Sequence, residues 1–509
     1  MKRMLPLLLA AILCLSLLTA CAKNNPADNT GSETANAFND ENWVSDIETL
    51  RFYLFDDSGK NAGNEEHVEA AINDILGPKL GINVDILFGD FGSYSTNLNL
   101  AISSNEEVDV AMLFLRAPAN FASMYANKQL SDMTDVMNRY APETLELLAP
   151  YLGATTFHGS VFGLPAYRIY ATNPYVVFRA DVLEQLGLED RARACSSWSE
   201  LISIWETIQT ESGLYATTGG AITSSQNYTL GKDAWSETTL VDVPDALGLV
   251  MVKDNKAESL FGWEGYINDC KSFAEWNEKG LIYPDAILTD SLPDELISNN
   301  VVASYITSSE TGIEATKEGN LGLDLTCVKI CDGMIKGSNL SSWGVCIPVT
   351  CEYPEKAAAF INELYTNPDI INLIAWGVEG TDYVVKNGEA CFPDDMTNAT
   401  YHERDFLLGN QFLVYPWEGQ GANFRELTLA ENQAAPISKY LSFTFDSEGL
   451  NTIQGNLSAV VDQYQKDFRG GYYTDEKYEE FSAKFKTAGI DEYVAAVQTQ
   501  LDAWLAENS

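Results

Sequence analysis

Segments of strand and helix pattern alternate through residues 50–114, and this alternation restricts the possible folds more than any other feature of the chain. Three segments have the apolar or alternating pattern of strands: Leu50–Phe55, Ile82–Phe88 and Val108–Phe114. Helical spacing covers residues 68–76 and 94–103 between them, and we expect Gly77-Pro78 to stop or kink the first helix. This β-α-β-α-β order predicts a parallel sheet with helices on both faces, which binds ligands outside the carboxyl ends of its strands.

The remainder of the chain predicts a mixed α/β protein with more than one core. Short strands are expected at 301–305 and 343–348, a helix at Pro354–Thr366, and an acidic, mostly helical tail at 474–506 with a turn at Gly489. The chain has 509 residues, of which 46% are hydrophobic and 20% charged. This length and composition predict two or three packed domains or lobes rather than a disordered chain.

The strong negative charge excludes one class of partner. The chain has 31 Lys+Arg against 73 Asp+Glu, which gives a formal charge of −42, and no basic stripe interrupts the acidity. A body of this charge repels phosphate backbones, so we expect no nucleic acid among its partners.

The N-terminus has the pattern of an export signal. Lys2 and Arg3 precede an apolar stretch that runs from Met4 to Leu18, shorter than the roughly 20 residues of a membrane-spanning helix. The sequence Leu18-Thr19-Ala20-Cys21 resembles the lipobox of bacterial lipoproteins. That resemblance implies a signal peptide at 1–20, lipid on Cys21, and attachment to the outer face of the cell membrane. An ordinary signal peptide or an uncleaved anchor remains the alternative. Residues 21–43 are mostly polar and predict a flexible tether.

No pattern of catalytic or metal-ligating residues is found. The sequence contains no G-x-G-x-x-G after the first strand, no P-loop lysine, no G-x-S-x-G and no H-E-x-x-H. The three histidines are far apart in the sequence, and we expect them to be solvated. Seven cysteines follow Cys21, and their spacing does not favour zinc, so free thiols or one or two disulfides are expected. We therefore predict no catalysis, no metal and no cofactor.

Three segments in series resemble a known family. They are Gly159-Ser160-Val161-Phe162-Gly163-Leu164-Pro165, the run Val176–Leu188, and Trp198-Ser199-Glu200-Leu201. In this order they resemble the extracellular solute-binding proteins of ABC importers, in the sugar-binding branch that includes maltose-binding protein. Phe178-Arg179 departs from the Tyr-Asn common in that branch. Further segments at 276–285, 371–383 and 488–504 are similar to lipoproteins of Gram-positive bacteria that carry a C-terminal domain of unknown function.

The resemblance implies a periplasmic-binding-protein-like α/β fold, with two lobes around a ligand cleft and two or three crossing segments. By the family layout, lobe one covers 44–165 plus 306–385, and lobe two covers 166–305 plus 386–509. A ligand then favours the closed arrangement of the lobes, which the permease subunits in the membrane recognise. We expect a monomer that binds an oligosaccharide.

Aromatic rings and polar residues at predicted strand ends and loops are the candidate ligand contacts, because sugars stack on rings and bind polar side chains through their hydroxyls. The candidates are Asp56, Asp57, Tyr94, Arg116, Tyr167, Arg168, Trp235, Trp263, Trp343, Trp376 and Trp417. Two other functions remain open. A surface glycoside hydrolase would need two carboxylates about 5–10 Å apart, and a binding protein of the same fold could instead take a peptide or an acidic oligosaccharide.

Overall fold

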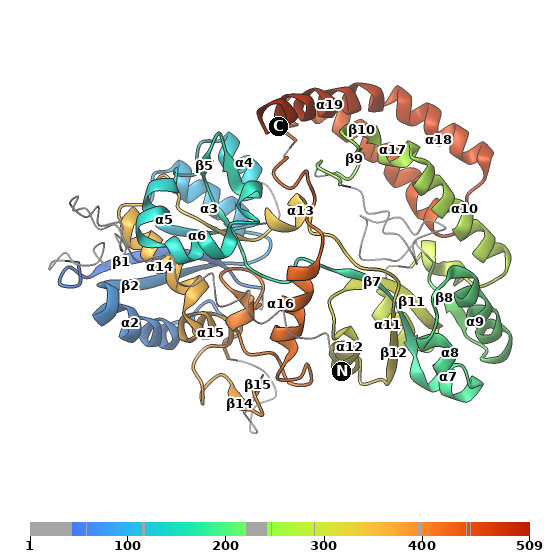
Figure 1. Cartoon of the computed structure of the whole chain (residues 1–509), viewed down its shortest axis with the longest axis horizontal. Coiled ribbons are helices and arrows are strands. Elements are labelled where there is room, and N and C mark those ends of the chain that lie inside the picture. The colour runs from blue at the N-terminus through green and yellow to red at the C-terminus, as the bar shows by residue number, and fades with distance from the viewer. Residues whose placement is uncertain are drawn as a thin grey trace, which may run out of the picture. The chain divides into compact units, whose positions relative to one another are not determined.

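The computed structural model describes residues 43–57, 59–114, 118–219, 242–245, 247–289, 291–393, 400–443, 445–447 and 449–508. Its first sheet has the strand order β2-β1-β3-β13-β6, and Figure 1 labels the strands β1 and β2 of this sheet. The strands are β1 (Glu48–Phe55), β2 (Ile82–Gly89), β3 (Val110–Leu113), β6 (Leu164–Pro165) and β13 (Gly344–Cys346). β1 is parallel to β2 and β3, as the alternation predicted, whereas β13 is antiparallel to β3 and β6.

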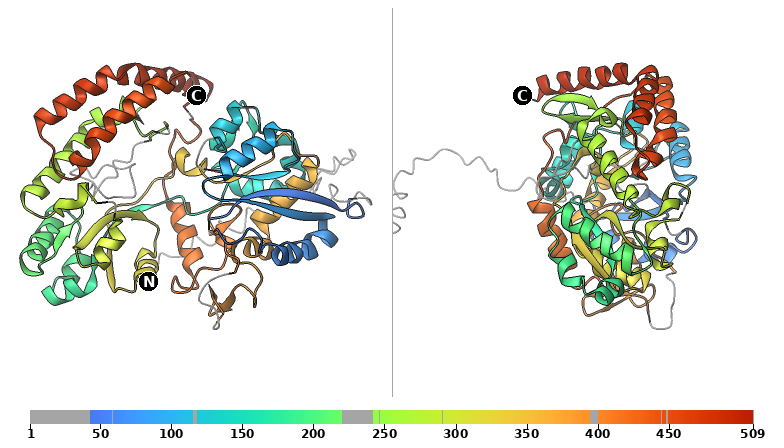
Figure 2. Two further views of the ribbon diagram at one scale, coloured as in Figure 1. Left: turned by 180° about the vertical axis from the view of Figure 1, so that it is seen from behind. Right: turned by 90° about the vertical axis from the view of Figure 1, so that its right-hand side faces the viewer.

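Helices cover this sheet at the positions predicted from the sequence. α2 (Glu66–Leu80) packs on β2, α3 (Tyr94–Ser103) follows it, and α14 (Pro354–Thr366) packs against β1. The left view of Figure 2 shows β1, β2 and α2 from behind. α2 does not stop at Gly77-Pro78 but continues to Leu80, because Pro78 falls in the last turn. The helix ends at Gly81, whose φ of 62° allows its N–H to donate to Gly77 O at 2.9 Å.

The second sheet has the order β12-β7-β11-β8. Its strands are β7 (Asn173–Arg179), β8 (Tyr215–Thr217), β11 (Val302–Ser309) and β12 (Leu325–Lys329). β7 is antiparallel to both of its neighbours and all of its residues are buried. One face packs against α9 (Trp198–Glu211), and the other packs against α11 (Pro293–Ser298). This sheet therefore has its own core on each side.

Two segments pack with a different sheet from the one that the predicted lobe boundaries assigned to them. β11 continues to Ser309 and β12 pairs with β7, so these strands belong to the second sheet, although the prediction gave 306–385 to the first lobe. Some residues after 386 show the opposite difference. Asn410 donates to Tyr365 O at 3.0 Å, and Asn372 donates to Leu413 O at 2.9 Å, so the 410–413 segment packs on helices of the first sheet. Strand pairing and docking of this kind join distant residues, and local patterns do not encode them.

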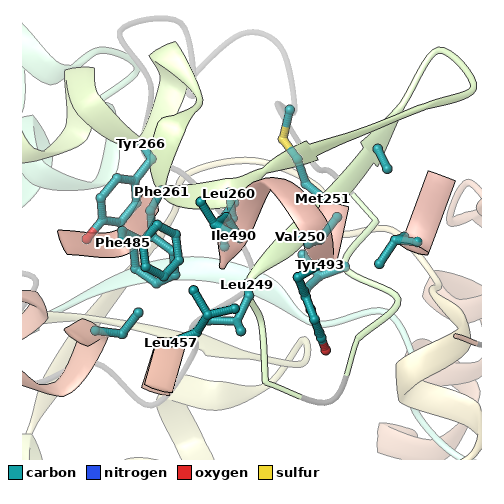
Figure 3. Packing of buried hydrophobic residues seen from close by; sticks show 14 of the residues in the cluster. Leu249, Val250, Met251, Leu260, Phe261, Tyr266, Leu457, Phe485, Ile490 and Tyr493 are labelled. Atoms are coloured by element: carbon teal, nitrogen blue, oxygen red, sulfur yellow. The ribbon is translucent and has the colours of Figure 1, made fainter. Parts of the chain in front are cut away.

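A third core is built by the C-terminal helices. The helices α17 (Asn451–Arg469), α18 (Asp475–Thr487) and α19 (Ile490–Glu507) pack with α10 (Glu264–Glu278) and the hairpin of β9 (Val250–Lys253) and β10 (Lys256–Ser259). Figure 3 shows part of this core, with Leu249, Phe261, Phe485 and Tyr493 among its labelled side chains. The predicted helical tail and its turn at Gly489, where φ is 108°, are confirmed.

Three segments connect the elements of the first sheet with those of the second sheet and the C-terminal core. They are residues 166–172, 330–343 and 435–442. They lie side by side, because a Cβ atom on Gly333 would lie 2.1 Å from Thr172 O and Ile335 N donates to Pro436 O at 2.9 Å. The helix α16 (Phe424–Ala434) packs on the first of them through Asn432, whose Oδ1 accepts hydrogen bonds from Tyr170 N and Ala171 N.

The cysteines of the folded part carry free thiols. Cys195, Cys270, Cys327, Cys331, Cys346, Cys351 and Cys391 all lie in the described part of the chain, and none of them is paired in a disulfide. Of the two alternatives that the sequence left open, the structure therefore shows free thiols.

No helix among the described residues combines the length and the apolar character that crossing a membrane requires.

Candidate functional site

A group of aromatic side chains lies at the carboxyl ends of β1 and β3. We call Phe55, Phe91, Phe114, Trp343 and Phe406 the edge cluster. The ring centroids of Phe55 and Phe114 are 5.0 Å apart, those of Phe114 and Trp343 5.4 Å, and those of Phe91 and Phe114 5.8 Å. Phe406 completes the group, with its ring 6.2 Å from that of Trp343.

The strand topology explains why these rings meet. Phe55 is the last residue of β1 and Phe114 follows β3, so both stand at the carboxyl end of the parallel strands. β13 is antiparallel and begins at Gly344 opposite Leu113, which places Trp343 at that same edge. A Cβ atom on Gly344 would lie 2.0 Å from Leu164 O, so only glycine allows β13 to enter the sheet there.

The cluster has a buried base and a partly open surface. Phe55 and Phe114 are almost fully buried, whereas Phe91 is 47% exposed and Trp343 and Phe406 are half-buried. Rings that are fixed on one side and open on the other can stack on flat apolar surfaces, such as the C–H faces of a sugar. The structure thus places the predicted residue Trp343 where stacking is chemically possible.

Arg168 extends the edge cluster with a positive charge. Its guanidinium carbon lies 5.7 Å from the ring centroid of Phe406 and 5.9 Å from that of Tyr170. Nη2 donates to Asn339 O at 3.2 Å, and Nε is buried without a partner among the described residues. Burial lowers the pKa of this guanidinium. The predicted residue Arg168 can therefore supply hydrogen-bond donors beside the aromatic surface.

An ion pair holds Phe406 at this edge. Arg404 Nε donates to Asp57 Oδ2 at 2.6 Å, which ties the 404–406 segment to the loop after β1. The predicted residue Asp57 therefore carries a structural ion pair, while its side chain keeps about a third of its surface exposed. The neighbouring Asp56 is 4% exposed, and its oxygens accept hydrogen bonds from the backbone N–H groups of Gly59, Asn61 and Ala62, which shapes the loop.

A buried carboxyl group lies behind this loop. Glu403 is 1% exposed and accepts hydrogen bonds from Asn61 Nδ2 and from Arg404 N. Burial, followed by the negative charges of Asp56 and Asp57, raises the pKa of Glu403 to about 8. The carboxyl group is therefore mostly protonated at neutral pH, and its place inside the protein marks it as a structural group.

Other predicted contacts belong to packed interiors. Tyr94 is fully buried, and its hydroxyl donates to Met112 O at 2.6 Å, so it has no accessible surface. Tyr167 is 6% exposed and packs against Phe412 and Tyr151. Both residues support the site, because the ring of Tyr94 lies 5.3 Å from that of Phe114 and Tyr167 directly precedes Arg168.

Three predicted tryptophans lie elsewhere in the fold. Trp263 packs against the C-terminal core, with its ring over Gly265. Trp376 is 5% exposed and donates to Tyr415 O, and its ring is 5.2 Å from that of Trp417. His402, which the sequence predicted to be solvated, is partly buried and stacks on Trp376. Arg116 and Trp235 lie outside the described residues.

The sequence did not single out Phe91 or Phe406 as contacts. Phe91 carried a usable signal, because it lies two residues after the end of β2. The sequence around Phe406 carried no such signal. Phe406 reaches the edge cluster only because the neighbouring Arg404 pairs with the distant Asp57. Within the described segments, no group of His, Cys, Asp and Glu side chains has an arrangement that could hold a metal ion.

Comparison with known proteins relates the chain to binding proteins. Residues 73–383 match the family described as bacterial extracellular solute-binding protein, and residues 439–506 match a domain of unknown function, DUF3502. A carbohydrate ABC transporter substrate-binding protein of Streptococcus pneumoniae serotype 4 is 21% identical over 463 residues, covering 88% of this chain and 89% of the relative.

Solved structures show the same fold. The N-glycan transport solute-binding protein NgtS of Streptococcus pneumoniae matches with a TM-score of 0.75 and 19% identity, over 91% of this chain and all of the other. The S. pneumoniae substrate-binding protein FusA, solved with kestose, matches with a TM-score of 0.61 and 16% identity, over 90% of this chain and all of the other. The expected α/β binding-protein fold is thus confirmed.

The first family match covers more than half of the chain, and the second covers the helical tail. Both agree with the resemblance seen in the sequence motifs, including the C-terminal domain of unknown function. The chain belongs to the bacterial extracellular solute-binding proteins, which bind solutes and do not catalyse reactions.

Proposed function

We propose that this protein is the substrate-binding component of a carbohydrate ABC importer and that it captures an oligosaccharide outside the cell. The names of its relatives support this function, because they include a carbohydrate transporter component and binding proteins for N-glycans and for kestose. The observation that carries the proposal is the edge cluster. Its exposed rings lie at the carboxyl ends of parallel strands, where α/β sheets bind ligands.

Binding by this site follows from the chemistry of sugars. The half-buried ring of Trp343 and the exposed ring of Phe91 stack on the C–H faces of sugar units, while Arg168 donates hydrogen bonds to their oxygens. We propose that the second sheet and its helices form a second lobe that closes over this surface. The ligand favours the closed arrangement by its higher affinity for it, and the permease recognises that arrangement.

The lobe boundaries that we propose follow the sheets. The first lobe comprises residues 44–165 and 344–434, and the second comprises residues 173–329 and 443–509. The three connecting segments at 166–172, 330–343 and 435–442 are then the crossing segments. This division keeps the hydrogen-bonded strands of each sheet together.

We propose that Cys21 anchors the protein to the membrane. Lipid on this cysteine would hold the folded part outside the cell on a tether of residues 21–43, and a monomer would suffice for delivery to the permease. The support is the lipobox-like sequence Leu18-Thr19-Ala20-Cys21 after a short apolar segment.

A ligand screen tests the proposed function. Melting temperatures are measured for the purified protein, without its first 21 residues, against di- to hexasaccharides and against peptides of two to six residues. An oligosaccharide at a hundred times its Kd should stabilise the fold by about 2.7 kcal/mol, which raises the melting temperature by a few degrees. Stabilisation by peptides alone would overturn the carbohydrate assignment. Release of free sugars from a bound oligosaccharide would instead indicate a hydrolase.

A further inference from the structure

Arg168 has no carboxylate partner among the residues that the structure describes, in contrast to several other arginines. Its guanidinium makes no ion pair with any acid in the described part of the chain, although the sequence contains 73 acids. Its Nη2 instead donates a hydrogen bond to the neutral carbonyl oxygen of Asn339. Five other arginines of the described part have a carboxylate oxygen within 4.0 Å: Arg51, Arg179, Arg193, Arg404 and Arg425.

The guanidinium of Arg168 is also shielded from water. Its Nε is buried without a partner, and the rings of Tyr170 and Phe406 lie within 6 Å of its carbon atom. Such a group has lost hydration that a neutral carbonyl replaces only in part. Contacts with the two rings offset some of this loss. Glu310 is the acid whose charge acts on Arg168 from nearby, and it makes no salt bridge with it.

The backbone holds Arg168 in a fixed position. Tyr167 N donates to Gly409 O at 2.8 Å, and Ile169 N donates to the side chain of Gln411 at 3.0 Å. Asn432 Nδ2 donates to the carbonyl oxygen of Arg168 itself at 2.8 Å. A donor group that is held in place before binding loses little entropy when a ligand arrives.

We propose that Arg168 makes this protein specific for acidic oligosaccharides, by receiving the carboxylate of one sugar unit while a neighbouring unit stacks on Trp343. A guanidinium binds a carboxylate through two parallel hydrogen bonds, and such charge-assisted bonds are stronger than bonds to neutral hydroxyls. Phe406 links the two contacts, because its ring lies 6.2 Å from Trp343 and 5.7 Å from the guanidinium carbon. The inference rests on the proposed function, since it names the ligand class of the same site.

Paired probes test this specificity without any mutation. Uronic-acid oligosaccharides and sialylated glycans are titrated calorimetrically, each beside its counterpart with the carboxyl group reduced to an alcohol. We expect an acidic probe to bind about 10- to 100-fold more tightly than its reduced counterpart, the range of one charge-assisted contact. Equal affinities, or binding of neutral oligosaccharides alone, would overturn the inference and leave the proposed function standing. Binding of peptides and no sugar would overturn both.

Variants then assign the preference to Arg168. Arg168→Gln should remove the preference for the acidic probe, and Arg168→Lys should keep a part of it, because lysine keeps the charge but not the fork of donors. The exposed Arg191, which contacts Ser203, provides the control Arg191→Gln with an unchanged preference. If Arg168→Gln does not fold, Glu310→Gln serves instead and should tighten binding of the acidic probe alone. If the preference persists in Arg168→Gln, or if Glu310→Gln has no effect, a group other than Arg168 binds the carboxylate.

Discussion

Phe91 and Trp343 contribute to the edge cluster in different ways, and this allows binding to be separated from stability. Phe91 is 47% exposed, so Phe91→Ala should lower the melting temperature only slightly. The same change removes a stacking surface and should weaken oligosaccharide binding by about 1–3 kcal/mol, by analogy with bases stacked on aromatic side chains. Calorimetric titration measures the affinity, and thermal unfolding measures the stability.

The control for this prediction is Trp263→Ala. Trp263 packs against the C-terminal core rather than the edge cluster, so its loss should lower stability and leave the intrinsic affinity unchanged. Trp343→Ala should lower both quantities, because its ring contacts Phe114 and Phe406. A loss of affinity in Trp263→Ala with none in Phe91→Ala would place the ligand elsewhere.

Glu403 gives the stability of the protein a pH dependence. Its pKa is raised from 4.5 to about 8 in the folded state, so the folded protein binds the proton more tightly than the unfolded chain. The stabilisation from this group is fully present below pH 4.5 and is lost as the pH rises towards 8, by up to about 1.4 kcal/mol per pH unit. Denaturant unfolding at several pH values should show that Glu403→Gln flattens this slope, whereas Glu355→Gln, on the exposed side of α14, keeps it.

Among the elements, β13 depends most clearly on a single residue. Gly344→Ala would place a methyl group 2.0 Å from Leu164 O, so β13 and β6 cannot pair without moving apart. We expect a loss of about 1–3 kcal/mol or more in the free energy of unfolding, together with weaker ligand binding, because Trp343 precedes this strand. Gly455→Ala is the matched control. It lies within α17 with no atom near the added methyl group, and it should stabilise the protein by about 0.5–1 kcal/mol. Equal unfolding free energies for the two variants would contradict this account of β13.

The elements that the sequence predicted well are those set by local periodicity. The strands and helices of residues 48–113 and the helix α14 follow from apolar spacing alone. The position of Trp343 followed too, because it directly precedes a strand-like run. The helix α3 was also predicted at the right place. The sequence did not show, however, that the side chain of Tyr94, its first residue, points into the core rather than towards a ligand.

What the sequence did not reveal depends on contacts between distant residues. β12 enters the second sheet by pairing with β7, about 150 residues earlier in the chain. Phe406 reaches the edge cluster because Arg404 pairs with Asp57, and these two residues are 347 positions apart. Single-sequence periodicity contains no information on such pairs, so the lobe boundaries and half of the site required the structure.

At the scale of the whole molecule, we expect lipid on Cys21 to hold the folded body at the membrane, because the lipobox-like sequence Leu18-Thr19-Ala20-Cys21 follows a short apolar segment. Cys21→Ala should abolish incorporation of labelled palmitate and release the protein into the medium or leave its precursor uncleaved. The matched control is Cys14→Ala, which lies within the predicted signal peptide and should still be labelled. Continued labelling of Cys21→Ala would show that the lipobox was misidentified.

The central claim is that an oligosaccharide binds at the carboxyl edge of the first sheet. A crystal structure of the protein with the tightest oligosaccharide from the screen tests this claim most directly. The account predicts a sugar ring stacked on Trp343 or Phe91, with another polar group of the ligand on the guanidinium of Arg168. A ligand bound at the pair Trp376 and Trp417, or against Trp263, with the edge cluster empty, would contradict it.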